Sequence, residues 1–325
     1  MTLQQIGEGI YTQDSFLDKV NQIDSIVFDC DGVLVDVTNS YDLAIQRTTT
    51  YVLKELANIQ KFDPVTSKII DGFKATGGFN DEVDLTYALI ISLAAANNLN
   101  KNGTQFIFDV INNADQTGIK SVEKYLESLN AEISELKKKL DYPGPHDENL
   151  LYSIFDQIFY GPELYKKISE KTSAFTDDGL IENDVVIVKS ELLEKLKKKF
   201  GNKVAIVTGR GIESIQYSLK ELLNEFNVNN SVFLEDESRE LAKPNPSSLI
   251  RTFKGIGATN CLYVGDSMED FIMAKKATEM GNETTFCGII GTSKFPDEKK
   301  KLFEEKNVEL ILNSIEFLPK VLNLD

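Results

Sequence analysis

Two carboxylates one residue apart follow a short apolar run near the start of the chain. The run is Ile26–Phe28, and the residues after it are Asp29, Cys30, Asp31 and Gly32. Side chains alternate along a strand, so the two acids share a face if the extended conformation persists, and Gly32 permits the turn that follows. Carboxylates held this close repel each other unless a cation lies between them. Mg²⁺ is the simplest such cation, because it takes oxygen ligands and keeps several waters.

An Asp-x-Asp pair alone is weak support for a site, because Asp and Gly also mark solvated turns. Later segments repeat the arrangement of an apolar run that ends in polar residues. These segments end at Thr208-Gly209-Arg210, at Lys243-Pro244, and at Asp266 with Asp270. Open α/β sheets bind ligands outside the carboxyl ends of their strands. The segments together therefore predict one site at one edge of such a sheet.

Helix and strand patterns alternate from residue 185 onward. A helix is expected at Val185–Phe200, and strands are expected at Val204–Val207, Val232–Leu234, Cys261–Val264, Thr285–Ile290 and Val308–Leu312. This alternation predicts an α/β fold with a doubly wound, Rossmann-like parallel sheet. The strand at Ile26–Asp29 belongs to the same sheet, because so short an apolar strand needs both faces covered.

The sequence between the two parts of this core shows helical patterns only. Helices are expected at residues 41–56, 64–73, 81–98, 103–116, 149–160 and 163–169. The predicted domains are an α/β core of residues 1–36 and 185–325 and an inserted all-helical cap of residues 37–184. The chain would cross between them near Val35–Asn39 and Ile181–Val185.

One predicted cap helix carries an apolar seam with alternating spacings of three and four residues. The seam consists of Ile119, Val122, Leu126, Leu129, Ile133, Leu136 and Leu140. We expect this seam to pack on the other cap helices and the protein to be a monomer. A coiled-coil dimer through Ile119–Leu140 is the alternative, since the seam is near the shortest length at which the pattern indicates a coiled coil.

Composition limits the partners of the protein. The chain has 325 residues and a net charge of −16 at pH 7, which disfavours nucleic acid and anionic membrane, because both require a basic face. The most apolar stretch, Leu85–Ala96, is shorter than the roughly 20 residues of a spanning helix. The first residues show no signal-peptide pattern, so a cytoplasmic location is expected.

Histidine and cysteine offer little chemistry here. His146 is the only histidine and is expected to be solvated in a Pro/Gly loop, which disfavours Ser-His-Asp hydrolysis and His-rich zinc sites. Cys30, Cys261 and Cys287 lie in apolar runs and are expected to be buried and reduced. Carboxylates remain as the chemically active groups.

At these residues the sequence resembles the haloacid dehalogenase superfamily of phosphoryl-transfer enzymes. The matching motifs are Asp29–Gly32, Thr208, Lys243 and Gly265–Asp270. The insert is similar to the helical cap of a subgroup whose members are described as phosphatases without an established substrate. That similarity rests on Gly77–Leu89 and Gly179–Asp184.

The resemblance implies a Mg²⁺-dependent phosphatase that acts on a small phosphorylated metabolite through an aspartyl-phosphate. Asp29 would attack phosphorus and would bind Mg²⁺ together with the main-chain carbonyl of Asp31 and the carboxylate of Asp266. Asp31 would protonate the leaving oxygen and then deprotonate the attacking water. The phosphoryl oxygens would be held by Thr208, Lys243 and the amides near Gly209.

Some roles stay open at this point. Asp270 could bind the metal, directly or through a water, could orient Lys243, or could only place a charge at a helix N-terminus. Arg210 could pair with the substrate phosphate or could be an exposed turn residue. In the cap, Lys74 and Asn80 could recognise the leaving group beside the flexible Gly77–Asp81 segment, or this segment could be a helix–helix turn with Asn80 as its cap.

Three other functions compete with a phosphatase. A phosphomutase or phosphotransferase would share every core residue and would pass the phosphoryl group to a second hydroxyl instead of water. Dehalogenase relatives need no metal and lack the second Asp, so Asp31 and Asp266 speak against that chemistry. An interaction protein without catalysis would use the apolar seam of the cap.

Overall fold

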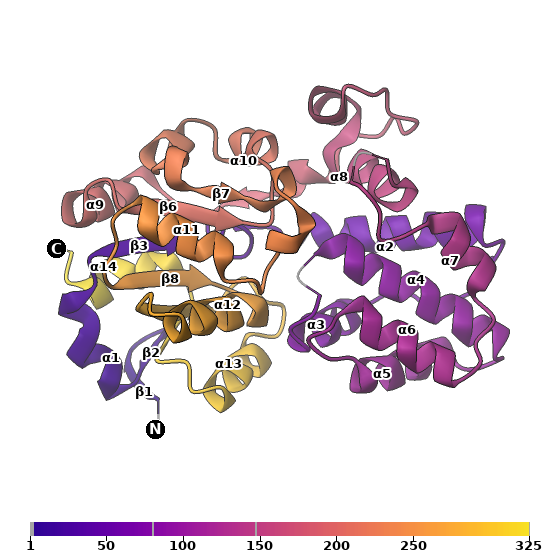
Figure 1. The fold of residues 1–325 in the computed structure, drawn as a ribbon, viewed down its shortest axis with the longest axis horizontal. Coiled ribbons are helices and arrows are strands. Elements are labelled where there is room, and N and C mark those ends of the chain that lie inside the picture. Colours follow the sequence, from indigo (N-terminus) through magenta and orange to yellow (C-terminus); the bar gives the residue numbers. More distant parts are fainter. Residues whose placement is uncertain (1–2, 80, 147, 325) are drawn as a thin grey trace. The chain divides into compact units, whose positions relative to one another are not determined.

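The computed structural model describes residues 3–79, 81–146 and 148–324, and Figure 1 shows the course of the chain. The chain forms two compact units. The core unit consists of Met1–Thr38 and Asp184–Asp325, and the cap unit consists of Asn39–Asn183.

The core unit is built on an eight-stranded sheet with the strand order β1-β2-β10-β9-β8-β3-β6-β7. The strands from β10 to β7 all pair in parallel. They are β3 (Ser25–Phe28), β6 (Val204–Thr208), β7 (Val232–Phe233), β8 (Cys261–Gly265), β9 (Thr284–Ile289) and β10 (Leu310–Leu312). The predicted parallel sheet is thereby confirmed.

An N-terminal hairpin that the sequence analysis did not identify extends this sheet. Strands β1 (Gln4–Gly7) and β2 (Ile10–Thr12) are antiparallel to each other, and β2 pairs antiparallel with β10. The pattern of β1 is polar and mostly exposed, so it lacks the apolar alternation that indicates a strand. Pairing with the sheet, and not local sequence preference, defines this strand.

Helices cover both faces of the sheet, as a doubly wound fold requires. Side chains of β3 alternate, so that Ile26 and Phe28 enter one apolar cluster and Val27 enters the other. The first cluster includes residues of α1 (Asp14–Lys19), α9 (Ser190–Phe200), α10 (Ile212–Leu219) and α14 (Leu318–Leu322). The second includes residues of α11 (Ser247–Gly255), α12 (Met268–Glu279) and α13 (Pro296–Glu305).

Short 3₁₀ turns connect these elements. They are η1 (Val20–Gln22), η4 (Lys220–Glu225), η5 (Val228–Asn230), η6 (Leu234–Asp236), η7 (Arg239–Leu241) and η8 (Ile315–Phe317). Helix α10 ends at Leu219, and the chain continues directly as the 3₁₀ turn η4.

The two segments that join the core to the cap form a small ribbon of their own. Strand β4 (Val35–Asp36) pairs antiparallel with β5 (Val185–Val186). The expectation of a helix from Val185 is wrong, because α9 begins only at Ser190. The run of β-branched residues from Val185 to Val188 favours extended backbone, which explains the difference.

The cap unit is helical. Its elements are α2 (Tyr41–Tyr51), which continues as the π-helix η2 (Val52–Leu56), then α3 (Ser67–Ala75), α4 (Glu82–Asn98), α5 (Gly103–Asn113), α6 (Ile119–Ser128), α7 (Ser134–Leu140), α8 (Leu150–Ser169) and η3 (Leu180–Asn183). Helix α4 packs against α2, α5, α6 and α8 and is buried along Leu85–Ala96 (Figure 1). The expected buried helix is thus the centre of the cap.

Two cap helices begin later than the sequence suggested. Helix α4 is capped by Asp81, whose side chain accepts hydrogen bonds from the amides of Val83 and Asp84. The predicted cap, Asn80, lies outside the described residues. Helix α3 begins at Ser67 and not after Asp63, because Thr66 is still extended.

The apolar seam of the cap is divided between two helices. The expectation of one helix over Ile119–Leu140 is wrong, because α6 ends at Ser128, Asn130 has a φ of 53°, and α7 begins at Ser134. Six of the seven seam residues are nevertheless buried: Ile119, Val122, Leu126, Ile133, Leu136 and Leu140. The expected packing of the seam inside the chain is confirmed, whereas the coiled-coil alternative lacks a continuous exposed face. A monomeric protein stays a prediction.

Candidate active site

The motif residues of the core gather where neighbouring parallel strands end. Asp29 directly follows β3, Thr208 ends β6, and Asp266 directly follows β8. Strand β3 lies between β6 and β8, and the amide of Asp29 donates to the carbonyl of Val264 at 2.8 Å. Segments far apart in the sequence therefore deliver their side chains to one edge of the sheet.

The ammonium group of Lys243 lies between two buried carboxylates. Lys243 Nζ is 2.8 Å from Asp29 Oδ1 and 2.7 Å from Asp270 Oδ1, and its side chain is 1% exposed. Asp29 Oδ1 also accepts a hydrogen bond from the amide of Cys30 at 2.8 Å. Within the described part of the chain, no hydrogen bond or ion pair reaches Asp29 Oδ2. Oδ2 is thus the oxygen of Asp29 that can act on a substrate.

Asp270 is held on both of its carboxylate oxygens. Tyr263 donates its hydroxyl to Oδ1 at 2.8 Å. The amide and the hydroxyl of Ser267 donate to Oδ2 at 3.1 and 2.8 Å, and the amide of Asp266 donates at 3.2 Å. Asp270 therefore orients Lys243 and fixes the turn between β8 and α12. Its role is not limited to placing a negative charge at a helix N-terminus.

The buried charges affect one another unequally. Burial raises the pKa of Asp29, and the neighbouring Asp270 adds to this effect while Lys243 opposes it. Burial acts to lower the pKa of Lys243, but Asp270 and Asp29 outweigh it and hold that pKa well above its usual value. Burial acts to raise the pKa of Asp270, but Lys243 and its hydrogen bonds keep it low. Burial thus disfavours the charged form of Asp29, whereas Lys243 and the hydrogen bonds favour the charged form of Asp270.

The same residues fit a divalent cation. Asp29, Asp266 and Asp270 each have a carboxylate oxygen within 4.8 Å of the others. Since donors hold both oxygens of Asp270, the carboxylates best suited to a metal are those of Asp29 and Asp266. Lys299 Nζ lies 2.7 Å from Asp266 Oδ2, so a positive charge is already accommodated beside this carboxylate. A site made only of oxygen donors suits Mg²⁺.

Gly32 is required by its surroundings. Its φ is +71°, and a Cβ atom at this position would lie 2.4 Å from Asp266 Oδ2. Side chains disfavour this backbone region, and the space for one is filled by the carboxylate. The turn after Asp31 therefore approaches Asp266 more closely than any other residue type would allow.

Arg210 is buried, so the alternative of an exposed turn residue is wrong. Its Nε donates to Asp31 Oδ1 at 2.7 Å, its Nη1 to Ser218 Oγ at 2.9 Å, and its Nη2 to Asp184 Oδ2 at 2.8 Å. The side chain of Arg210 is 1% exposed and that of Asp184 is 4% exposed. Sequence analysis noted Asp184 only as the last residue of a cap motif and did not identify Ser218.

Thr208 ends β6, the strand that pairs with β3, and Gly209 follows it. Thr208 is fully buried, and its hydroxyl accepts a hydrogen bond from the amide of Arg210 at 3.3 Å. Gly209 is exposed, and a Cβ atom there would meet nothing within 4 Å. Their predicted role in holding phosphoryl oxygens stays a prediction.

Lys74 and Gly78, in the part of the cap proposed for substrate recognition, each have close neighbours inside the cap. Lys74 Nζ is paired with Glu82 Oε1 at 2.9 Å. A Cβ atom on Gly78 would lie 2.5 Å from the carbonyl oxygen of Asp115 and 2.7 Å from the amide of Gly118. Close backbone packing inside the cap thus explains this glycine. Substrate recognition by Lys74 stays a prediction, and Asn80 lies outside the described residues.

His146 is not simply solvated, and the prediction that it would be is wrong. Its Nε2 lies 2.9 Å from Asp156 Oδ2, and its ring packs on Tyr152 with the centroids 4.3 Å apart. The side chain is 34% exposed. The loop composition predicted solvent contact, but a carboxylate ten residues later on α8 provides a partner.

The three cysteines are buried and free, as expected. Burial raises the pKa of the Cys30 thiol well above its usual value, so a thiolate is disfavoured there. Cys30 belongs to an apolar cluster on one face of the sheet and has a packing role.

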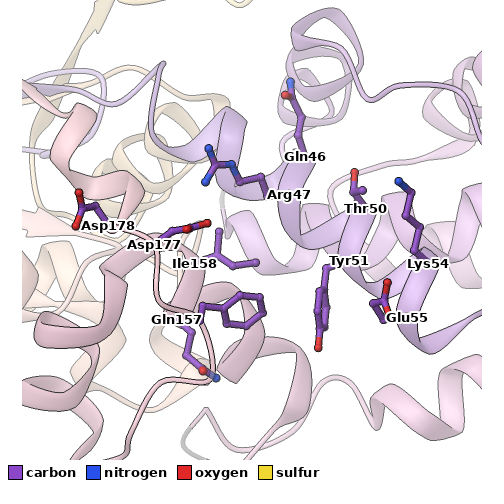
Figure 2. A pocket seen from close by; sticks show the side chains of 11 residues that line it. Gln46, Arg47, Thr50, Tyr51, Lys54, Glu55, Gln157, Ile158, Asp177 and Asp178 are labelled. Carbon is purple, nitrogen blue, oxygen red and sulfur yellow. The ribbon is translucent and has the colours of Figure 1, made fainter.

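The cap unit contains a separate hollow of about 490 Å³, shown in Figure 2. Side chains of α2, η2, α8 and the segment at residues 175–178 line it. Among them are the cations Arg47 and Lys54 and the carboxylates of Glu55, Asp177 and Asp178. This hollow was not predicted from the sequence, and its lining includes no motif residue of the core.

The chain is similar to several solved structures of other proteins. A phosphatase, Tt82 from Thermococcus thioreducens, is 22% identical, with 85% of this chain and 98% of that chain covered and a TM-score of 0.54. A structural-genomics target is 18% identical, with coverages of 93% and 98% and a TM-score of 0.57. A beta-phosphoglucomutase from Clostridium difficile is 15% identical, with coverages of 93% and 97% and a TM-score of 0.41. No protein with a curated description matches.

None of the helices within the described residues is both long and apolar enough to span a membrane. The family model of the haloacid dehalogenase-like hydrolases matches residues 23–278, a range that runs from just before β3 into α12. That range includes Asp29, Thr208, Lys243 and Asp266, the residues that meet at the edge of the sheet. The chain therefore belongs to the haloacid dehalogenase-like hydrolase family.

Proposed function

We propose that this protein is a Mg²⁺-dependent phosphatase that hydrolyses a small phosphomonoester through an aspartyl-phosphate on Asp29. The observation that supports this most strongly is the state of Asp29 itself. Lys243 and the amide of Cys30 hold Oδ1, whereas Oδ2 has no partner among the described residues. A nucleophilic carboxylate needs this arrangement, in which one oxygen fixes the orientation and the other can attack.

The first half of the reaction forms the acyl phosphate. Asp29 Oδ2 attacks phosphorus, and the bond from phosphorus to the leaving oxygen breaks. Asp31 gives its proton to that oxygen, so the alcohol leaves neutral. Lys243 and Thr208 neutralise and orient the phosphoryl oxygens, which carry most of the charge in phosphoryl transfer.

The second half returns the enzyme to its starting state. Asp31, now ionised, takes a proton from a water molecule, and the water oxygen attacks phosphorus. The bond between phosphorus and Asp29 Oδ2 breaks, inorganic phosphate leaves, and both carboxyl groups regain their starting protonation. One carboxyl group can serve both steps because the proton it gives first is the one it later recovers.

Asp29 and Asp266 would hold Mg²⁺, together with the main-chain carbonyl of Asp31. When bound, the cation supplies positive charge that favours ionised Asp29 and neutralises the phosphoryl group. The positive charge of the cation would offset the effect of burial, which disfavours the charged form of Asp29. The neighbouring ion pair of Lys243 and Asp270 has no net charge.

A screen of phosphorylated metabolites tests this function. Each compound is incubated with the protein in Mg²⁺ and again with a chelator, and released phosphate is measured. We expect at least one phosphomonoester to be hydrolysed in Mg²⁺ and spared with the chelator. Equal rates with Mg²⁺ and with the chelator would contradict the proposed role of the metal. Transfer of the phosphoryl group to an added sugar without phosphate release would show a phosphomutase or phosphotransferase instead.

A further inference from the structure

The acid–base carboxylate has a charged partner that neither phosphate binding nor metal binding explains. Arg210 Nε donates to Asp31 Oδ1 at 2.7 Å, and the Asp31 side chain is 22% exposed. Arg210 follows Thr208 by two residues, so the segment that ends β6 provides both groups. The conformation of the Asp31 side chain thus depends on Arg210, which lies in the turn after β6.

Arg210 is itself fixed at its other end. Its Nη2 donates to Asp184 Oδ2 at 2.8 Å, and its Nη1 donates to Ser218 Oγ at 2.9 Å. The Ser218 hydroxyl also lies 3.3 Å from Asp184 Oδ2. A guanidinium is planar and its donors have fixed directions, so three partners leave it a single orientation.

The backbone links the same residues a second time. Asp31 forms a bridge with Val35, and the amide of Gly32 donates to the carbonyl of Val35 at 2.8 Å. Val35 pairs with Val186 across the β4–β5 ribbon, and Asp184 directly precedes β5. Arg210 therefore closes a loop of contacts between Asp31 and the point where the chain returns from the cap.

We propose that Arg210, held by Asp184 and Ser218, is the positioning residue for Asp31. This inference rests on the proposed phosphatase function. Arg210 donates to Oδ1 and thereby fixes the orientation of the carboxyl group that gives and later recovers the proton. Orientation of this kind is valuable because a displacement of about 1 Å can cost about a hundredfold in rate. It also gives the Gly179–Asp184 motif a task, since Asp184 is its last residue.

The proposal differs from direct phosphate binding by Arg210. Each guanidinium nitrogen group already has a protein partner, and the side chain is 1% exposed. Because the side chain is buried, a phosphate ligand could reach Arg210 only if neighbouring groups moved. Loss of Arg210 should therefore affect proton transfer and leave substrate binding nearly unchanged.

The test compares Arg210→Met with Arg251→Met, a control at an exposed arginine that pairs with Glu237. Both variants are assayed on phenyl phosphate, which has a poor leaving group, and on p-nitrophenyl phosphate, which has a good one. For Arg210→Met we expect kcat on phenyl phosphate to fall by about 10- to 100-fold, with KM unchanged. From p-nitrophenyl phosphate, Asp29 should be phosphorylated at nearly the normal rate, and the aspartyl-phosphate should then accumulate. The control should behave as the wild type.

A double-mutant cycle separates positioning from a general structural effect. In an Asp31→Asn background, Arg210→Met should cause little further loss, because the group it positions is already absent. Asp184→Asn keeps Arg210 in place but loosens it, and should give a smaller loss of the same kind. If Arg210→Met does not fold, Asp184→Asn with the same substrates decides the question.

Three results would overturn the proposal. They are equal losses in the rate of Asp29 phosphorylation from both substrates, a raised KM with unchanged kcat, or full additivity with Asp31→Asn. Failure of the phosphatase function looks different, because the wild type would then hydrolyse neither ester and form no aspartyl-phosphate. The two ideas can thus fail separately.

Discussion

Replacing Lys299 by Met is expected to tighten the binding of Mg²⁺ by about fivefold. Lys299 Nζ lies 2.7 Å from Asp266 Oδ2, and the two side chains are 18% and 25% exposed. A metal that binds Asp266 must displace this ammonium group or share the carboxylate with it. A partly buried charged contact of this kind contributes about 1 kcal/mol. Since 1.4 kcal/mol corresponds to about tenfold in affinity, removal of the Lys299 ammonium group should raise the Mg²⁺ affinity about fivefold.

The assay measures Mg²⁺ affinity directly, by calorimetric titration and by the rise of the melting temperature with Mg²⁺ concentration. Lys301→Met is the matched control, because Lys301 is exposed on the same helix, α13, and the change in net charge is the same. Long-range charge effects should appear in both variants, and only Lys299→Met should show the additional gain. Unchanged affinity relative to the control, or weaker binding, would refute competition between Lys299 and the metal.

The geometry of the core leads to two further predictions. Gly32→Ala should lower the free energy of unfolding by about 1–2 kcal/mol from the positive φ alone, and should weaken Mg²⁺ binding because the new Cβ displaces Asp266; calorimetry showing normal Mg²⁺ affinity would contradict it. Burial acts to raise the pKa of Asp24, but hydrogen bonds from Lys203, Asn260 and Thr259 outweigh it and lower the pKa to about 2. The folded-state pKa is below the unfolded one, so Asp24 contributes stability above pH 4 that is lost as the pH falls toward 2. Asp24→Asn should therefore reduce unfolding free energy by about 1–2 kcal/mol at pH 7 and much less near pH 2, as measured in urea; an equal difference at both pH values would contradict it.

The catalytic edge could be predicted from sequence because each part of it is local. Asp29, Thr208 and Asp266 each end an apolar run, and parallel strands bring such ends together. The doubly wound sheet followed from the same runs. Nothing more than the order of elements and the alternation of side chains was needed for these predictions.

The partners of these residues could not be predicted, because they come from positions with ordinary local patterns. Lys299 lies in a run of lysines that is typical of a solvated helix face, yet it contacts Asp266. Arg210 lies between two glycines in what reads as a turn, and its burial depends on Asp184 and Ser218. Such contacts depend on how distant segments pack.

Elements with weak local preference were also missed. Strand β1 has a polar sequence, and its place at the sheet edge depends on pairing with β2. The apolar seam from Ile119 to Leu140 has helical spacing throughout, so spacing alone could not show the break at Asn130. The seam is still packed within the chain, because six of its seven residues are buried.

The most direct test of the account is the location of the phosphoryl group during turnover. The Asp31→Asn variant is mixed with p-nitrophenyl phosphate and Mg²⁺, quenched in acid, digested and analysed by mass spectrometry. Asp31→Asn lacks the base for the water step, so the aspartyl-phosphate should accumulate on the peptide that contains Asp29. The same experiment with Asp29→Asn should show no covalent phosphate and no turnover. Phosphate on another residue, or near wild-type activity of Asp29→Asn, would contradict the proposed nucleophile.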